Sequence, residues 1–507
     1  MTSLLRALFL GAIALAAACA RPEPRSAVAP RIAAGQLPSL DRWRQHVTDE
    51  LLPFWTLPDA LGTPVGNFPT FRCNDGSLFR TESPCSELAN APRWITSELA
   101  RDYTRMKSRQ TYLYGVAFHI TGEERYLEYA RAGVAWLREH AYERDTGSAV
   151  TYWVNGKPEP PPDERTTQDL AYAQVGLAFY YYLTRDPDVL ADLVRLERHI
   201  MTKYWDDSTG PAGGMLRWVN ADGPTPGDRK RQELVSQLDQ INAYMLVVAP
   251  LLEDEAVAKA WQGDMVRLAH VVKDRFFAPE LGMFHGTTHD PAASGLGTRH
   301  TDFGHSMKSL WMLYLVGQRT GDPALVDFAR PLVAPLLARA AQPSGCWASE
   351  PAADGTLHTD SQWWISAELD QAAATLAGRE PIAEPYAKYL ARSYDCWLTR
   401  FVDHKNHDVW PFVPADWNPS AFDHDAPAKL HHWKNGYHAM EHALVAMITT
   451  AGLTGQRLPL YYAFVKDPPA SRIQPYYFSG TIANDTAHQL PQHPTLHGHK
   501  VVFSDLR

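Results

Sequence analysis

The stretch HTDFGHSMKSLWMLYLVGQRTGDPALVDFARPLVAPLLARAAQ (residues 300–342) predicts two α-helices separated by a short break. Its second half carries apolar residues at the spacing of one helix face, namely Leu325, Phe328, Ala329 and Leu332. The break at residues 320–323 contains a glycine and an acidic residue. This stretch therefore predicts a pair of consecutive helices.

The same order of helical run, short break and second helical run recurs along the chain. We expect six such breaks, at residues 121–123, 184–187, 253–255, 320–323, 378–381 and 451–455. Their spacing of roughly 55 to 75 residues is too long for a repeat of thirty-odd residues and suits paired helices with long loops between the pairs.

Helical spacing along the whole chain predicts twelve helices. They lie near residues 40–54, 98–120, 124–141, 165–184, 187–205, 229–252, 255–275, 300–319, 322–342, 360–377, 381–401 and 435–452. Strand-like alternation is limited to short stretches such as 149–154 and 214–219. The prediction is an all-α fold, an (α/α)6 barrel of six helical hairpins whose even-numbered helices line the inside. An open solenoid is the alternative.

Length and composition favour one large domain. The 507 residues would allow about three domains, but the helical pattern runs almost from end to end without a low-complexity linker. We assign the barrel to residues 39–456 and a C-terminal extension to 457–507. The 16 Trp and 22 Tyr suit a pocket for sugars or other ring compounds, whereas the net charge of −9 with scattered Lys and Arg argues against nucleic acid as a partner.

Residues 1–19 resemble a bacterial lipoprotein signal peptide, with a short basic start, an apolar stretch and small residues before Cys19. Cys19 is then the lipidated residue and residues 20–38 a tether; an ordinary signal cleaved near Ala18 is the alternative. Ala20 favours the periplasmic side of the outer membrane, with the N-terminal lipid as the only membrane contact. In such a compartment Cys73 and Cys85, which flank a polar loop, are expected to pair. Cys346 and Cys396 lie in unrelated segments, and neither spacing resembles a zinc site.

Polar and aromatic residues gather at the N-terminal halves of the even-numbered helices, after the long loops. They are Arg109, Gln110, Asp169, Gln174, Asp239, His305, Trp363, Trp364, Glu368, Trp433 and His438. In a barrel they converge at one mouth, where helix N-termini favour developing negative charge, as in an enolate or oxyanion.

Four short motifs occur in order on these inner helices. They are Ser108-Arg109-Gln110, Phe303-Gly304-His305, Trp363-Trp364-Ile365-Ser366-Ala367-Glu368 and Trp433-Lys434-Asn435-Gly436-Tyr437-His438. Together they resemble the N-acylglucosamine 2-epimerase and cellobiose 2-epimerase superfamily, which also includes aldose–ketose isomerases. The resemblance extends from about residue 40 to 455.

The resemblance implies removal and return of a proton at the carbon next to a sugar aldehyde, carried out by His305 and His438. By similarity, Arg109 stabilises the cis-enediolate oxygen. Trp363, Trp364 and Trp433 pack around the sugar ring, and Glu368 either binds sugar hydroxyl groups or orients a histidine. Such a mechanism needs no metal or organic cofactor, and either a monomer or a homodimer is compatible with it.

The chain departs from the family pattern at three places. The family usually has Glu where Lys308 stands, His and Glu where Asp239 and Asn242 stand, and Asn and Arg where Ala439 and Glu441 stand. Lys308 either binds an anionic substrate such as a uronic acid or neutralises Glu441. Asp239 and Asn242 either bind substrate or cap and pair with neighbouring loops.

Several simpler or different interpretations remain open. The tryptophans fit barrel core, and Arg109 fits a structural ion pair. Asp239 and Glu368, if they face each other, fit the carboxylate pair of an inverting glycosidase. His438, Glu441 and His442 match the spacing of an inverted zincin site, and the C-terminal histidines (His488, His493, His497 and His499) fit an ordered or a disordered end better than a metal site.

Three functions follow as hypotheses. The first is an epimerase or isomerase acting at C2 of a reducing sugar or oligosaccharide, and the exported location favours an oligosaccharide or polymer. The second is a polysaccharide lyase or glycoside hydrolase acting on an acidic, uronate-containing glycan. The third is a glycan-binding lipoprotein without catalytic activity.

Overall fold

The computed structural model describes residues 32–33, 35–208, 214–418, 422 and 426–507. The predicted signal peptide with Cys19 and most of the predicted tether lie outside these residues. The tether's last residues pack on the barrel, because Ile32 N donates to Leu453 O at 3.0 Å and Leu37 is buried. Within the described residues, none of the helices has the length and apolar character needed to span a membrane.

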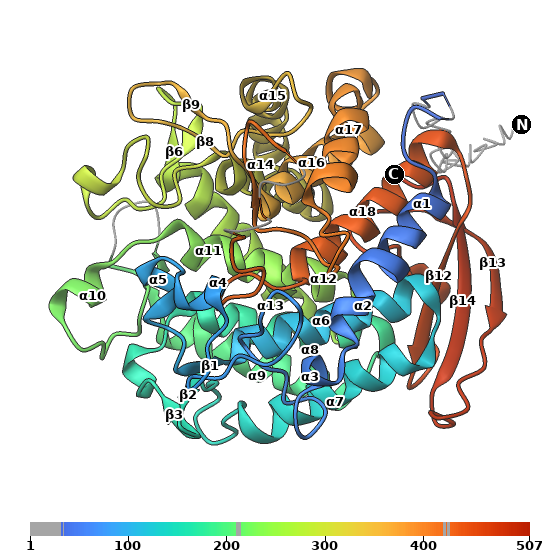
Figure 1. Cartoon of the computed structure of the whole chain (residues 1–507), viewed down its shortest axis with the longest axis horizontal. Helices are drawn as coiled ribbons and strands as arrows, with labels where there is room; N and C mark the ends of the chain where they lie inside the picture. Colours follow the sequence, from blue (N-terminus) through green and yellow to red (C-terminus); the bar gives the residue numbers. More distant parts are fainter. Residues whose placement is uncertain (1–31, 34, 209–213, 419–421, 423–425) are drawn as a thin grey trace, which may run out of the picture.

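All twelve predicted helical segments are present (Figure 1). The first comprises α1 (Leu40–Gln45), the π-helix η1 (His46–Leu51) and α2 (Leu52–Trp55). The next are α6 (Thr104–Thr121), α7 (Glu124–His140), α8 (Thr167–Thr184), α9 (Pro187–Lys203), α11 (Leu234–Gln240) continued by η3 (Ile241–Met245) and α12 (Leu246–Val248), and α13 (Glu255–Val271) with η5 (Val272–Phe276). The last are α14 (Phe303–Thr320), α15 (Pro323–Ala340), α16 (Trp363–Arg379), α17 (Glu384–Cys396) with η7 (Trp397–Phe401), and α18 (Tyr437–Thr454).

Burial separates an inner from an outer ring of helices. In α8, every residue except Asp169 is buried, so this helix is surrounded by protein. The following helix, α9, buries one stripe that includes Val189, Leu193 and Ile200 and exposes its other face. This alternation is typical of an (α/α)6 barrel with the even-numbered helices inside, as predicted.

The sixth break does not separate two helices. Gly455 ends α18 in a left-handed conformation with φ of 70°, and the next element is the strand β12 (Leu458–Phe464). The outer helix that contacts α18 is instead α1 from the N-terminal end of the barrel. The ring of helices is therefore closed by α1 and α18, from the two ends of the domain. The prediction of six pairs of consecutive helices did not include this pairing.

The long loops carry short elements. The helices are α3 (Pro58–Leu61), α4 (Ser86–Ala89), α5 (Arg93–Thr96) and α10 (Pro226–Lys230). The strands are β1 (Arg101–Tyr103), β2 (Tyr152–Val154), β3 (Lys157–Glu159), β4 (Trp205–Asp206), β5 (Met215–Leu216), β6 (Phe277–Ala278), β7 (Met283–Phe284), β8 (Glu350–Pro351), β9 (Leu357–His358), β10 (Ser361–Gln362) and β11 (Phe412–Val413). The predicted Cys73–Cys85 disulfide is confirmed. Cys346 and Cys396 form a second disulfide, which was not predicted because the two residues lie 50 positions apart in the sequence.

The C-terminal extension closes one end of the barrel, opposite the end at which the inner helices begin. Its strands β12, β13 (Thr481–Ala487) and β14 (His497–Ser504) form a sheet in the order β12-β14-β13, seen in red at the right of Figure 1. In the segment that connects β12 to β13, Tyr476 and Tyr477 are buried among the inner helices. Their backbone and hydroxyl groups hydrogen-bond to Tyr112, Tyr182, Asn242, Arg319, Arg379 and Glu441, one residue from each inner helical segment. The extension is thus an ordered part of the barrel.

Candidate active site

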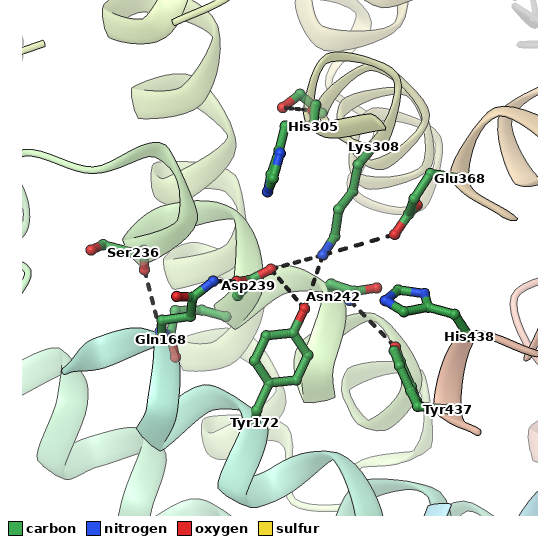
Figure 2. A network of polar contacts seen from close by, with 12 residues as sticks. Gln168, Tyr172, Ser236, Asp239, Asn242, His305, Lys308, Glu368, Tyr437 and His438 are labelled. Carbon is green, nitrogen blue, oxygen red and sulfur yellow. Dashed lines mark hydrogen bonds and ion pairs between the residues drawn. The ribbon is translucent and has the colours of Figure 1, made fainter. Parts of the chain in front are cut away.

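A cavity of about 530 Å³ lies where the inner helices begin, within the range of small-molecule sites. It brings together eight residues predicted from sequence, namely Arg109, Asp239, His305, Lys308, Trp363, Trp364, Trp433 and His438. It also contains Trp94, Gln168, Tyr172, Arg299, His300, Asp302 and His432, which sequence reasoning missed. Figure 2 shows His305 and His438 on different helices with Lys308 between them.

His305 is oriented by the residue that caps its own helix. Asp302 is the N-cap of α14, and its Oδ1 accepts from His305 N at 2.7 Å. The other carboxylate oxygen, Oδ2, lies 2.7 Å from His305 Nδ1. A proton on Nδ1 donates to this carboxylate, which leaves Nε2 for the cavity and stabilises the imidazolium that forms when Nε2 takes a proton. An Asp three residues before a histidine at a helix start was the available signal for this residue.

His438, in the first turn of α18, has a comparable but looser arrangement. Its Nδ1 lies 3.7 Å from Glu441 Oε2, and the side chain is nine-tenths buried. Burial, and then the positive charges of Arg109 and Lys308, hold the pKa of His438 well below its ordinary value. The imidazole is therefore neutral at neutral pH and able to accept a proton.

Glu441 links this histidine to the C-terminal extension. The Tyr476 hydroxyl donates to Glu441 Oε1 at 2.6 Å. Burial raises the pKa of Glu441 to about 6, although the bond from Tyr476 acts in the opposite direction. Glu441 is therefore largely ionised at pH 7 and places a negative charge behind His438.

Aromatic rings form walls around the two histidines. The ring centroid of Trp364 lies 4.7 Å from that of His305 and 6.5 Å from that of His438. Trp363 lies 6.5 Å from His438 on the same measure. The two imidazoles therefore share an apolar wall that limits the access of water to them.

Arg109 supplies a positive charge at the cavity. One guanidinium nitrogen donates to Trp433 O at 2.8 Å, and the guanidinium carbon lies 3.9 Å from the centre of the Tyr172 ring. Its Nε is buried and lacks a hydrogen-bond partner among the described residues. Since the contacts that hold Arg109 are with a carbonyl and with rings, its charge remains available for an anionic group in the cavity.

Lys308 and Asp239 form a buried ion pair. Lys308 Nζ donates to Asp239 Oδ1 at 2.8 Å and to the Tyr172 hydroxyl at 3.2 Å, and Gln168 donates to Asp239 Oδ2 at 2.9 Å (Figure 2). Burial lowers the pKa of Lys308, but Asp239, Tyr172 and Glu368 together outweigh this effect and hold the pKa above its ordinary value. The direct ion-pair partner of Lys308 is therefore Asp239 and not Glu441, although the positive charge of Lys308 still lowers the pKa of Glu441. Lys308 and Asp239, which both depart from the family pattern, thus neutralise each other's charge.

Glu368 and Asn242 are not among the residues that line the cavity. Glu368 accepts from Trp311 Nε1 at 2.9 Å and lies 3.9 Å from Lys308 Nζ, and burial raises its pKa to about 8. Asn242 donates to the Tyr437 hydroxyl at 3.4 Å. Their assignment to substrate binding remains a prediction. The structure places both in the layer directly behind the cavity wall.

The residues considered for two alternative chemistries make other contacts in the structure. Asp239 and Glu368 both lie against the Lys308 ammonium, at 2.8 Å and 3.9 Å, and Glu368 does not line the cavity. In the zincin-like run, His442 Nε2 pairs with Asp370 Oδ2 at 2.8 Å, whereas His438 lines the cavity. His438 and His442 thus have different neighbours and do not form a common metal site.

A model of the N-acylglucosamine 2-epimerase (GlcNAc 2-epimerase) family matches residues 95–441. The cellobiose 2-epimerase of Bacteroides fragilis is 23% identical over 354 residues, which cover 66% of this chain and 84% of that protein. Two solved structures share the fold. Cellobiose 2-epimerase from Bacillus thermoamylovorans B4167 has a TM-score of 0.63 at 16% identity, covering 80% of this chain and 98% of that one. A D-mannose isomerase has a TM-score of 0.60 at 15% identity, covering 82% and 100%.

The family match extends over more than half of the chain and includes His305, His438 and the Lys308–Asp239 pair. The fold agrees with it over most of the barrel. The chain therefore belongs to the N-acylglucosamine 2-epimerase family and is an enzyme of the sugar epimerase and isomerase class.

Proposed function

We propose that the protein epimerises or isomerises a reducing sugar at C2, by proton transfer between the substrate and the His305 and His438 imidazoles. The observation that carries this proposal is the pair of imidazoles on one cavity, each with a carboxylate on the Nδ1 side, at 2.7 Å for His305 and 3.7 Å for His438. This arrangement leaves each Nε2 for the substrate.

The reaction needs a base, an acid and a group that stabilises an oxyanion. Neutral His438 removes the C2 proton of the open-chain sugar, and the electron pair moves into a cis-enediolate whose oxygen is stabilised by Arg109. In epimerisation, His305 returns a proton to the opposite face of C2, and the two imidazoles exchange protonation states. In isomerisation, the hydroxyl proton moves from O2 to O1 and a proton is returned to C1 instead of C2. No redox partner is required, because oxidation and reduction occur within the sugar.

The pairing of Lys308 and the raised pKa of Glu368 favour a neutral sugar. Lys308 is paired with Asp239 at 2.8 Å, so its charge is already balanced. Burial raises the pKa of Glu368 to about 8, so this neighbour is largely uncharged at pH 7. The positive charge of Arg109 remains for the oxyanion that develops during the reaction. We therefore infer a neutral aldose or a neutral oligosaccharide with a free reducing end, in preference to a uronate.

We also propose that the enzyme is exported and held on the periplasmic side of the outer membrane through a lipid on Cys19. The support is the sequence of residues 1–19 and the two disulfides, which are typical of exported proteins. Labelling with a radioactive fatty acid, followed by membrane fractionation, tests this. A Cys19→Ala variant is expected to lose the label and to leave the membrane fraction.

Proton NMR in deuterium oxide tests the reaction directly. The purified protein is incubated with glucose, mannose, cellobiose and N-acetylglucosamine, and the C2 proton signal is followed. We expect loss of the C2 proton signal together with appearance of the C2 epimer or the ketose. Absence of exchange with every sugar, or release of new reducing ends from cellobiose, would contradict the proposal.

Replacing Asp302 by Asn is expected to lower kcat about 10- to 100-fold, a typical result of removing the partner that orients a functional imidazole. The Asn side-chain oxygen can still cap α14, but its amide cannot accept a hydrogen bond from His305 Nδ1. Steady-state kinetics with the sugar identified by NMR measure the effect.

Asp322→Asn is the matched control for this variant. Asp322 caps α15 and pairs with His270 Nε2 at 2.7 Å, so it has the same two roles outside the cavity. We expect Asp322→Asn to leave kcat within about twofold of wild type. Equal kcat values for the two variants would contradict a positioning role for Asp302.

The activity is expected to fall on the acid side near pH 6, where Glu441 titrates. The pKa of Glu441 is raised to about 6, and the ionised form is the active one, so activity is full well above that pH, half-maximal near it and lost below it. Tyr476→Phe removes a hydrogen bond to the carboxylate. Such bonds are worth about 1.5–3 kcal/mol, so the acid limb of kcat/KM should move up by about one pH unit or more.

The control for the pH profile is Tyr461→Phe, in the same C-terminal extension. The Tyr461 ring lies against His488, 4.9 Å between centroids, and does not contact Glu441. Its acid limb is expected to match that of wild type. An unchanged limb in Tyr476→Phe would show that Glu441 does not control the activity.

A further inference from the structure

A second cavity, of about 1010 Å³, adjoins the active site. It lies between two segments, which Figure 1 shows next to each other. One is the N-terminal loop with the Cys73–Cys85 disulfide and the helices α4 and α5 that follow it, and the other is the segment before α18. Asn74 joins these two segments, because its Nδ2 donates to Pro427 O at 3.0 Å and Lys429 N donates to its Oδ1 at 2.7 Å. The cavity is thus bounded by two segments that are bonded to each other.

The two cavities meet at Trp94, which lines both. Its ring centroid lies 5.0 Å from that of His431, in the second cavity, and 5.5 Å from that of His432, in the active site. Trp94 is 53% exposed. Among the described residues it is the only aromatic side chain in the group of exposed large hydrophobic residues. An exposed indole between two cavities is a surface on which the apolar face of a sugar ring can stack.

The charge of the second cavity points to neutral glycans. Its wall contains the carboxylates of Asp59, Asp75 and Glu87 and one cationic side chain, Arg80. Burial holds the pKa of His431 well below its ordinary value, so this residue adds no positive charge at neutral pH. An anionic sugar would be repelled, whereas sugar hydroxyls can donate to carboxylates and accept from Asn90 or Arg80.

This wall is built mainly from residues that precede the region matched by the family model. Most of the lining residues lie between Asp59 and Trp94, whereas the family match begins at residue 95. Most of the cavity wall therefore lies outside the residues that the family model matches, in a loop that the Cys73–Cys85 disulfide braces.

We propose that the second cavity binds the glycosyl units of a neutral oligosaccharide whose reducing end lies between His305 and His438, with Trp94 as the stacking platform at the junction. This proposal rests on the proposed function, because it extends the substrate from the reacting sugar outward. It makes the enzyme selective for oligosaccharides over monosaccharides.

The first test compares substrates of different length. In Trp94→Ala, we expect kcat/KM for cellobiose and cellotriose to fall about 10- to 100-fold, and to fall more than kcat/KM for glucose and mannose does, because Trp94 also lines the active-site cavity. Asn90→Trp places a bulky side chain in the second cavity, away from the histidines, and should have the same selective effect. Val465→Ala, an exposed apolar residue outside both cavities, is the control. Equal losses for monosaccharides and oligosaccharides, or no loss for either, would overturn the proposal.

The second test measures binding without turnover. Isothermal titration calorimetry is carried out with cellotriose, β-1,4-mannotriose and trigalacturonate on His305→Asn, with and without Trp94→Ala. We expect a neutral trisaccharide to bind, the acidic one to bind more weakly, and Trp94→Ala to weaken binding about 10- to 100-fold. Trp94-dependent binding without C2 exchange in wild type would support this cavity and refute the proposed function. C2 exchange in wild type, together with binding that does not depend on Trp94, would support the proposed function and refute this cavity as the glycan site.

Discussion

His305→Asn and His438→Asn are each expected to lower the rate of C2 epimerisation or isomerisation about 10²- to 10⁴-fold, the usual contribution of a positioned acid or base. Both side chains are largely buried, and Asn keeps a polar group of smaller size at each position. The fold should therefore be retained, which circular dichroism would show. Steady-state kinetics would measure the loss.

The single variants also separate the roles of the two imidazoles. If each histidine serves one face of C2, the histidine that remains can still remove the proton from one epimer and return deuterium to the same face. We expect C2 deuterium in recovered substrate without formation of the epimer, and with the opposite substrate preference in the two variants. Loss of exchange in one variant only, with both substrates, would indicate a single-base isomerase.

His270→Asn is the matched control for these variants. His270 pairs with Asp322 as His305 does with Asp302, at the same 2.7 Å, but on outer helices. It should retain the wild-type rate. If His305→Asn and His438→Asn also kept more than about a tenth of that rate, the proposed proton transfer would be refuted.

Lys308→Met is expected to lower the free energy of unfolding by about 3–5 kcal/mol, because it leaves Asp239 buried without its cation. The two side chains are only 4% and 1% exposed, so water replaces the lost partner poorly. The double variant Lys308→Met/Asp239→Leu should recover most of this loss, since it removes both charges. Urea unfolding followed by circular dichroism provides the measurement.

The control is the exposed pair of Arg330 and Asp327 on α15, with side chains 46% and 69% exposed. Arg330→Met is expected to change the free energy of unfolding by no more than about 1 kcal/mol. Equal changes for Lys308→Met and Arg330→Met would contradict a stabilising role for the buried pair. A loss of activity toward acidic sugars alone, with unchanged stability, would restore Lys308 as a ligand for an anionic substrate.

The helices and the catalytic pair were predictable because their signals are local. Apolar periodicity marks each helix within about 18 residues, and His305 and His438 each occur in a short motif at a helix start. Asp302 was missed, although an Asp three residues before His305 is itself a local signal. Tyr172 and Trp94 had no comparable signal, because an aromatic residue in a helix or loop reads equally well as core.

The partners of the charged residues were not predictable. Lys308 could pair with Asp239, 69 residues away, or with Glu441, and only the packing of the inner helices brings Asp239 to 2.8 Å. In the same way Tyr476 reaches Glu441, and Cys346 reaches Cys396, from segments with no sequence relation to them.

Local periodicity and short motifs thus established the helices, their alternation and the gathering of functional side chains at one mouth of a barrel. The tertiary structure decided the ring closure by α1 and α18, the ion pair beneath the site and the second cavity beside it. The physical reason is distance. A helix is selected by contacts three and four residues apart, whereas the pairing of buried charges and the shape of a cavity depend on separations that exist only after the helices pack.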